Sequence, residues 1–173
     1  MREILFRGKR TDNGEWETGS LVIIRDGCSD KEVFIADKMT GYHTPVISET
    51  VGQYTGLTDK NGVRIFEGDI LRGFEYPFCS NNNGEFNYFA EIVWFDDSSA
   101  FGIYTLKNPK SNVRGILEGN TDYLKYFNVD KWEVIGNIHD NPELIETAAK
   151  PADKNIAQSG LAPATEKFEL MEV

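Results

Sequence analysis

The chain has 173 residues, which is enough for one domain with its own core, and its composition is that of a globular protein. A formal net charge of −10 repels phosphate groups and therefore disfavours nucleic acid as a partner. A local basic face on an acidic protein can still bind nucleic acid, and the N-terminus supplies one cluster of this kind: Arg2, Arg7, Lys9 and Arg10.

The cysteines and the apolar runs indicate where the protein works. Cys28 and Cys79 lie far apart without Cys-x-x-Cys spacing, which argues against a zinc site or a redox motif. The first residues alternate charged and apolar side chains and lack the apolar core of a signal peptide. No apolar run approaches the roughly 18 residues that cross a membrane. We therefore expect a soluble, cytoplasmic protein with two free thiols.

The N-terminal part predicts a series of short strands. An apolar run at 4–6 and a longer run at 15–24 flank Asn13 and Gly14, a dipeptide that favours a primed hairpin turn. A further strand is expected at 32–36, which is rich in apolar and aromatic residues. The sequence therefore predicts an N-terminal β-hairpin region.

The stretch at 51–71 is the most constrained part of the sequence. Its four glycines each allow a positive φ or a close approach of two backbone segments: Gly52, Gly56, Gly62 and Gly68. The pattern predicts a strand, a tight turn at 59–62 and a second strand, with a bulge or a sharp bend at Gly68. We expect this stretch to shape the fold and to carry no chemistry.

The strongest β pattern lies at 88–95, and a turn at 96–99 connects it to a second run at 100–106. With another strand near 132–135, this spacing predicts a mainly β protein built on a small, bent SH3-like barrel. The expected organisation is an N-terminal β region at 1–50, the barrel and a short helix at 51–149, and a linker or tail at 150–173.

The C-terminal part gives weaker patterns. Residues 121–127 fit a helical turn and a strand equally well. A short C-terminal helix is expected at 142–149, because Asn141 can cap it and Pro142 suits the first helical position. Three apolar residues lie near the end of the tail: Phe168, Leu170 and Met171. They either dock on the same molecule, dock on a neighbouring copy, or do not dock at all.

Candidate catalytic and metal-binding residues are few. The two histidines are His43 and His139, and although Asp140 follows His139, residues adjacent in sequence commonly point apart. Four carboxylates in acidic turns could hold a divalent cation: Glu67, Asp69, Asp96 and Asp97. Turns also use aspartate and glutamate for local backbone hydrogen bonds, which explains these residues without a metal. We therefore expect a protein that is not an enzyme and has no catalytic residue, metal site or cofactor.

The aromatic residues of the predicted hairpin have two interpretations. These aromatic residues can either stack nucleobases or form the core: Tyr88, Phe89, Trp94, Phe95, Phe101 and Tyr104. The hairpin has no Lys or Arg beside them that would contact the phosphates of a nucleic acid. We interpret them as core residues. A nucleic-acid-associated β-barrel module remains the alternative function.

Three segments resemble one known family, the YopX family of phage and prophage proteins. They are REILFRG at 2–8, GQYTGLTDKNG at 52–62 with IFEGDI at 65–70, and VIGNIHDNPELI at 134–145. The resemblance spans residues 1 to about 147 and implies a largely β protein with an SH3-like barrel, encoded by a phage or prophage within a bacterial host cell. The family often has tyrosine where this chain has His139, which weakens a catalytic role for that residue.

The resemblance brings no activity and no functional residues. An acidic surface without an evident site favours an accessory protein that acts by protein–protein contact. The expected partners are a phage or host protein and further copies of this chain, so we expect a homo-oligomer.

Overall fold

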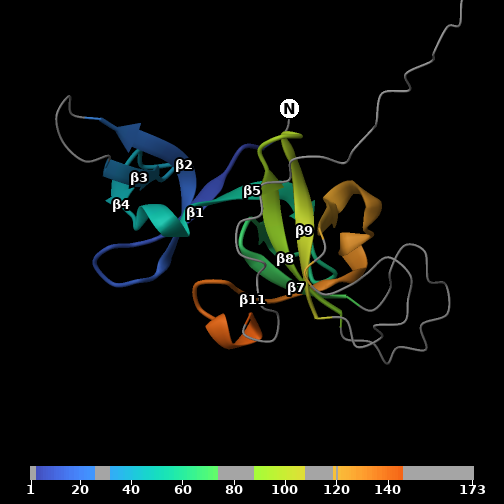
Figure 1. The fold of residues 1–173 in the computed structure, drawn as a ribbon. Helices are drawn as coiled ribbons and strands as arrows, with labels where there is room; N and C mark the ends of the chain where they lie inside the picture. Colours follow the sequence, from blue (N-terminus) through green and yellow to red (C-terminus); the bar gives the residue numbers. More distant parts are fainter. Residues whose placement is uncertain (1–2, 26–31, 74–87, 108–118, 120, 146–173) are drawn as a thin grey trace, which may run out of the picture.

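The computed structural model describes residues 3–25, 32–73, 88–107, 119 and 121–145. Its strands form two antiparallel sheets that lie side by side (Figure 1). Within these residues the helical elements are four 3-10 turns of three residues each, and no helix is long and apolar enough to cross a membrane. The prediction of a mainly β protein is therefore confirmed.

The first sheet has the strand order β4-β3-β2-β1-β5-β6. Its strands are β1 (Phe6–Lys9), β2 (Trp16–Ile24), β3 (Glu32–Ala36), β4 (His43–Pro45), β5 (Gly52–Thr58) and β6 (Arg64–Phe66), with the 3-10 turn η1 (Ser48–Thr50) before β5. The predicted strands at 15–24 and 32–36 are confirmed. The first strand begins at Phe6, two residues later than predicted, because its pairing with β2 and β5 starts there.

The loop between β1 and β2 differs from the predicted primed turn. Gly14 has a φ of 73°, but Asn13 is not among the residues with positive φ, which a type I′ turn requires at both central positions. The loop is instead closed by backbone hydrogen bonds from Gly14 to Arg10 and from Arg10 to Glu15. The Asn13 side chain accepts from the Glu15 N–H at 2.9 Å, which stabilises this wider loop.

The second sheet has the strand order β10-β9-β8-β7-β11. Its strands are β7 (Asp69–Gly73), β8 (Tyr88–Phe95), β9 (Ala100–Lys107), β10 (Thr121–Tyr123) and β11 (Glu133–Asn137), with the 3-10 turns η2 (Leu124–Tyr126), η3 (Val129–Lys131) and η4 (Pro142–Leu144). The predicted β8–β9 hairpin is confirmed. Residues 121–127 contain both elements that the sequence allowed, a short strand followed by a 3-10 turn.

Two finer predictions of the fold are not confirmed. The described strands form two open sheets and no closed barrel, so the likeness to an SH3 barrel stays a prediction. Only the start of the expected helix is described, and there it is the 3-10 turn η4, while 146–149 lie outside the described residues. Asn141 does not cap η4, because its side chain bonds Asn137 and Glu143 instead. The division at residues 50 and 149 stays a prediction.

The glycine-rich stretch carries the chain from one sheet into the other. Strand β6 belongs to the first sheet and β7 to the second, and only Glu67 and Gly68 separate them. Gly68 has a φ of 77°, so the predicted sharp bend is confirmed. Gly52 serves a different purpose, since a Cβ there would lie 2.6 Å from the carbonyl oxygen of Glu67.

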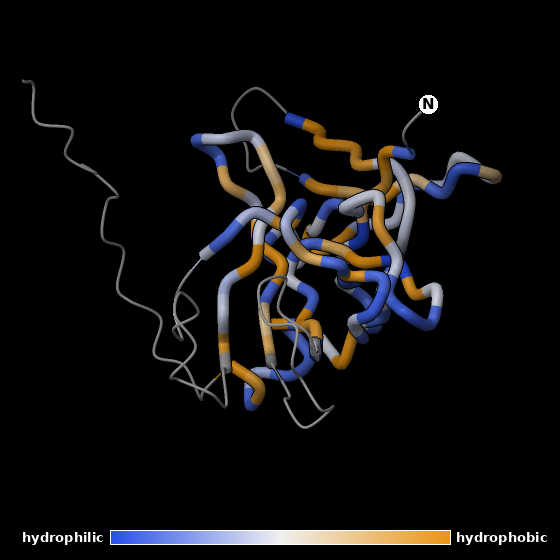
Figure 2. The backbone as a smooth tube through the Cα atoms, turned by 90° about the vertical axis from the view of Figure 1, so that its right-hand side faces the viewer, coloured by the Kyte–Doolittle hydropathy of each residue, from blue (hydrophilic) through white to orange (hydrophobic). Residues whose placement is uncertain are grey.

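The second sheet is packed on both faces. Figure 2 shows the apolar segments gathered along the strands and the hydrophilic segments mostly at turns. On β8, Ala90 and Ile92 join the larger core cluster around Trp132, while Val93 packs on the opposite side with Ile70. Alternation along the strand places Glu91 on that opposite side. The buried Glu91 carboxylate therefore lies on the face of the sheet that also carries Ile70 and Val93.

Candidate functional site: a pocket at the seam of the two sheets

A pocket of about 260 Å³ lies where the chain passes from one sheet to the other. Residues of η1, the β6–β7 turn, β8 and the turn after β11 line it, and we call it the seam pocket: Glu49, Val51, Glu67, Gly68, Glu91, Ile92, Val93, Trp94, Ile138 and His139. The pocket therefore combines one strand of the second sheet with turns that adjoin the strands of both sheets.

Three glutamates give the seam pocket a negative field. Glu49 is exposed, Glu67 is half-buried and Glu91 is only 5% exposed. Burial raises the pKa of Glu67, and the nearby Asp96 carboxylate raises it further. The described lining contains no lysine or arginine. A cation entering the pocket would therefore lie near Glu67 and offset the cost of keeping this half-buried carboxylate ionised.

The other walls are apolar or neutral. Val93 and Ile138 are partly buried and pack against the same core cluster, and both line the pocket. Burial lowers the pKa of His139, and the positive charges of Arg7 and Lys9 lower it further, against the opposing effect of Asp140. His139 is therefore a neutral wall of the pocket at pH 7.

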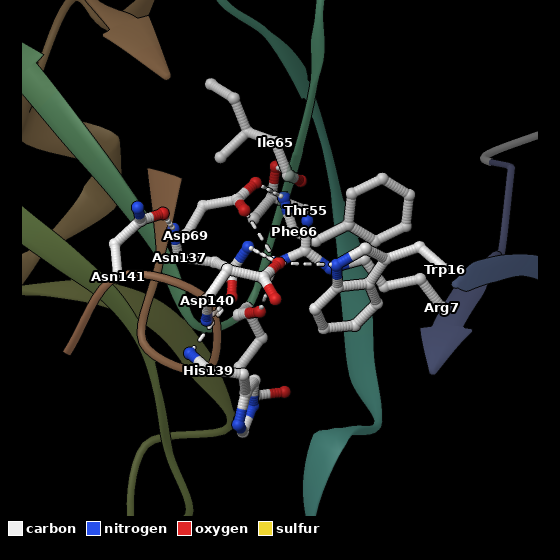
Figure 3. Close-up of polar contacts among 11 residues, drawn as sticks. Arg7, Trp16, Thr55, Ile65, Phe66, Asp69, Asn137, His139, Asp140 and Asn141 are labelled. Carbon is white, nitrogen blue, oxygen red and sulfur yellow. Dashed lines mark hydrogen bonds and ion pairs between the residues drawn. The ribbon is translucent and has the colours of Figure 1, made fainter. Parts of the chain in front are cut away.

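Asp140 anchors the turn that carries His139 to the first sheet. Its carboxylate accepts hydrogen bonds from Trp16 Nε1 at 2.7 Å and from Asn137 Nδ2 at 2.8 Å (Figure 3). It also forms an ion pair with Lys9. Partial burial works against ionisation, but these contacts lower the pKa of Asp140 to about 2. The rings of Trp16 and His139 lie 5.9 Å apart, so the anchor also fixes the imidazole.

Arg7 forms a second link between the sheets. Its guanidinium lies 2.6 Å from Asp69 and over the rings of Trp16 and Phe66, 4.5 and 4.9 Å from their centres. It also donates to the carbonyl oxygen of Glu67 at 3.3 Å. Burial raises the pKa of Asp69, and Arg7 opposes that rise. The second Asp69 oxygen accepts from the Phe66 N–H at 2.8 Å, which fixes the bend into β7.

The structure separates the carboxylates that the sequence placed together. Asp69 points to Arg7, whereas Glu67 lines the seam pocket. In the described ranges no three His, Cys, Asp or Glu side chains are grouped so as to hold a metal ion. Asp140 contacts Trp16 and Asn137, and the exposed His43 in β4 lies beside Phe34. The arrangement is suited to binding a cationic and partly apolar group.

The basic cluster and the aromatic hairpin also have internal partners. Each of three N-terminal cations pairs with a carboxylate, in the pairs Arg7–Asp69, Lys9–Asp140 and Arg10–Asp12; Arg2 lies outside the described residues. In the hairpin, Tyr104 is buried, Trp94 packs on Phe101 and Phe95 packs on Tyr123. The interpretation as core residues therefore holds for the buried Tyr104, whereas Trp94 is 36% exposed and is not a core residue.

Sequence reasoning missed most of the seam pocket. Glu49, Glu91 and Ile138 were not candidates, and His139 was considered only as a candidate catalytic residue. One signal was available, because Glu91 is a charged residue within the apolar run 88–95 and a buried charge calls for an explanation.

Comparison with known proteins gives the family. No curated protein matches the chain. Among solved structures, the crystal structure of protein EF1440 from Enterococcus faecalis is similar at 25% sequence identity, with 84% of this chain and 99% of that chain covered and a TM-score of 0.42. The family model described as YopX protein matches residues 5–146. The resemblance seen in the sequence is thereby confirmed, and the chain belongs to the YopX protein family.

Proposed function

We propose that this protein is a phage- or prophage-encoded accessory protein that binds a partner protein, and that the seam pocket receives a basic side chain of that partner. The observation that carries the proposal is the pocket itself. Glu49 and Glu67 reach it from two different elements, Glu67 is half-buried, and the described lining contains no lysine or arginine. This arrangement supports a binding protein more than an enzyme.

Lysine and arginine match both properties of the seam pocket. Their apolar stems can lie against Val93 and Ile138 while the charged head meets the carboxylates. Partial burial strengthens a charge pair, because water screens it less there than on the open surface. A partner from the phage or from the host would satisfy this chemistry equally.

We also propose that the protein self-associates. Among the described strands, β4 and β6 lie at the edges of the first sheet and β10 and β11 at the edges of the second, and an edge strand presents backbone groups that can pair with another chain. Light scattering on a size-exclusion column tests this proposal separately. A strict monomer at high concentration would contradict it and leave the partner-binding proposal standing.

The partner-binding proposal is tested by an NMR titration with Nα-acetyl-arginine amide as the probe. We expect the largest shifts at the amides of Gly68, Val93 and His139, and weaker binding by Glu67→Gln. Glu32→Gln is the matched control, because Glu32 is an exposed glutamate in β3 outside the pocket. Shifts confined to other surfaces, or equal binding by the two variants, would refute the proposal.

A further inference from the structure

We infer that Lys38 of a second copy of this chain enters the seam pocket, carried there by the turn between β3 and β4. This inference rests on the proposed function and names both the partner and its basic residue. We call residues 37–42 the β3–β4 tip. The tip combines a lysine with the two most exposed large apolar side chains of the described residues, Met39 at 95% and Tyr42 at 70%.

Hydrogen bonds fix the shape of the β3–β4 tip. The backbone closes it with bonds from the Asp37 N–H to the Tyr42 carbonyl at 3.0 Å and from the Gly41 N–H to the Asp37 carbonyl at 2.9 Å. The Asp37 carboxylate accepts three more, from the Met39 N–H at 3.0 Å and from the N–H and the hydroxyl of Thr40 at 2.7 and 2.8 Å. A preorganised turn loses little conformational entropy on binding, so its exposed side chains are suited to an interface.

Lys38 is available to a second copy at little cost. In its own molecule its ammonium pairs with Glu3 at 3.1 Å, and the two side chains are 46% and 43% exposed. An exposed pair contributes little to stability, so replacing Glu3 by another carboxylate costs little. Lys38 and Met39 do not line the pocket of their own molecule, and β3 and β4 lie at the end of the first sheet away from β8 (Figure 1). We therefore place the contact between two copies.

The tip and the pocket carry opposite charges. Lys38 is the basic residue of the tip, and the Asp37 carboxylate is engaged by the hydrogen bonds of its own turn. In the pocket Glu67 is half-buried, and the described lining contains no lysine or arginine. Because the chain has a net charge of −10, two copies repel one another overall, and contact is favoured where a cation of one copy meets a carboxylate of the other.

The apolar surfaces also match. The stem of Lys38 would lie against Val93 and Ile138, which line the pocket, while its ammonium meets Glu67. Met39 would then reach Trp94, which lines the pocket and is 36% exposed, and methionine packs favourably on aromatic rings. Apolar contacts around a charge pair exclude water and so strengthen the pair.

Sedimentation velocity of the full chain over a range of concentrations tests the inference. Lys38→Glu and Met39→Asp should each weaken association at least about tenfold, as the loss of a central interface residue does. Arg25→Glu makes the same change of charge at an exposed residue outside the tip, so it is the matched control and should keep the association of the parent. Saturating Nα-acetyl-arginine amide should dissociate the parent, because it occupies the site of Lys38.

A mixed NMR sample tests which surfaces meet. Isotope-labelled Lys38→Glu protein has an intact pocket and an altered tip, and unlabelled Glu67→Gln protein has an intact tip and an altered pocket. Adding the second protein to the first should shift the amides of Gly68, Val93 and His139, whereas adding unlabelled Lys38→Glu protein should leave them unchanged. Equal shifts from both additions, or shifts confined to other surfaces, would overturn the inference.

The failures of the two proposals are distinguishable. If Nα-acetyl-arginine amide binds the pocket but the parent stays monomeric at high concentration, this inference is wrong and the pocket proposal stands. The same conclusion follows if Lys38→Glu and Met39→Asp associate as strongly as the parent. If Nα-acetyl-arginine amide does not bind the pocket, the proposed function fails and this inference fails with it.

Discussion

The Arg7 guanidinium of β1 lies 2.6 Å from the Asp69 carboxylate at the start of β7, and this ion pair connects the two sheets. The Asp69 side chain is 1% exposed and the Arg7 side chain 12%. A buried carboxylate that loses its cation is strongly destabilising, because neither water nor another charge replaces that partner. The pair is therefore a structural element of the seam, next to the pocket.

We predict that Arg7→Ala lowers the free energy of unfolding by about 3 kcal/mol. Arg10→Ala is the matched control, because Arg10 pairs with Asp12 at 2.7 Å on the exposed surface, and its loss should cost much less than the loss of Arg7. Urea denaturation of the two variants measures both values. Equal costs would mean that the Arg7–Asp69 pair does not hold the sheets together.

We predict that Gly56→Val and Gly68→Val each cost about 1–3 kcal/mol of stability, because valine is strained at positive φ. The φ values are 89° at Gly56 and 77° at Gly68. At Gly56 a Cβ would meet nothing within 4 Å, so the cost there comes from the backbone alone. Gly56→Asn should be much milder, since asparagine tolerates this conformation. Variants that melt at the same temperature as the parent would show that the fold does not require glycine at these two positions.

Glu67→Gln should raise the melting temperature at pH 7 by about 1–3 °C while it weakens binding of the arginine probe. The folded state raises the pKa of Glu67, so the Glu67 carboxyl ionises at a lower pH in the unfolded chain than in the folded protein. At pH values where the unfolded chain is ionised, ionising Glu67 in the folded protein therefore lowers the free energy of unfolding. The difference between variant and parent should therefore shrink as pH falls below 4.5, the ordinary glutamate value. Thermal denaturation at several pH values measures this difference in melting temperature. A Glu67→Gln variant less stable than the parent at pH 7 would show that the ionised Glu67 does not destabilise the fold.

His139 should make stability depend on pH just below neutrality. Its pKa is lowered from 6.5, so below that pH the unfolded chain binds a proton that the folded chain does not. The free energy of unfolding should therefore rise as pH increases toward about 7, and His139→Gln should reduce this slope. His43→Gln, at an exposed position in β4, is the control and should keep it. An unchanged slope in His139→Gln would show that another group is responsible.

The sequence predicted the local features well and the site poorly, for one physical reason. The β8–β9 hairpin and the bend at Gly68 depend on neighbouring residues, whose patterning and turn chemistry are visible in one segment. The seam pocket combines Glu49, Glu91 and His139 from distant segments, and only the pairing of the strands brings them together. Residues 121–127 stayed ambiguous because Tyr123 pairs with β9 while Leu124 turns into the core.

The central claim is that the seam pocket recognises positive charge on a partner side chain. Comparing the Kd of Nα-acetyl-arginine amide with that of Nα-acetyl-citrulline amide tests it most directly, because citrulline keeps the shape of arginine and lacks its charge. We predict that the parent prefers the arginine probe by at least about tenfold, equivalent to about 1.4 kcal/mol, and that Glu67→Gln reduces this preference. Equal affinity of the parent for the two probes would contradict the account.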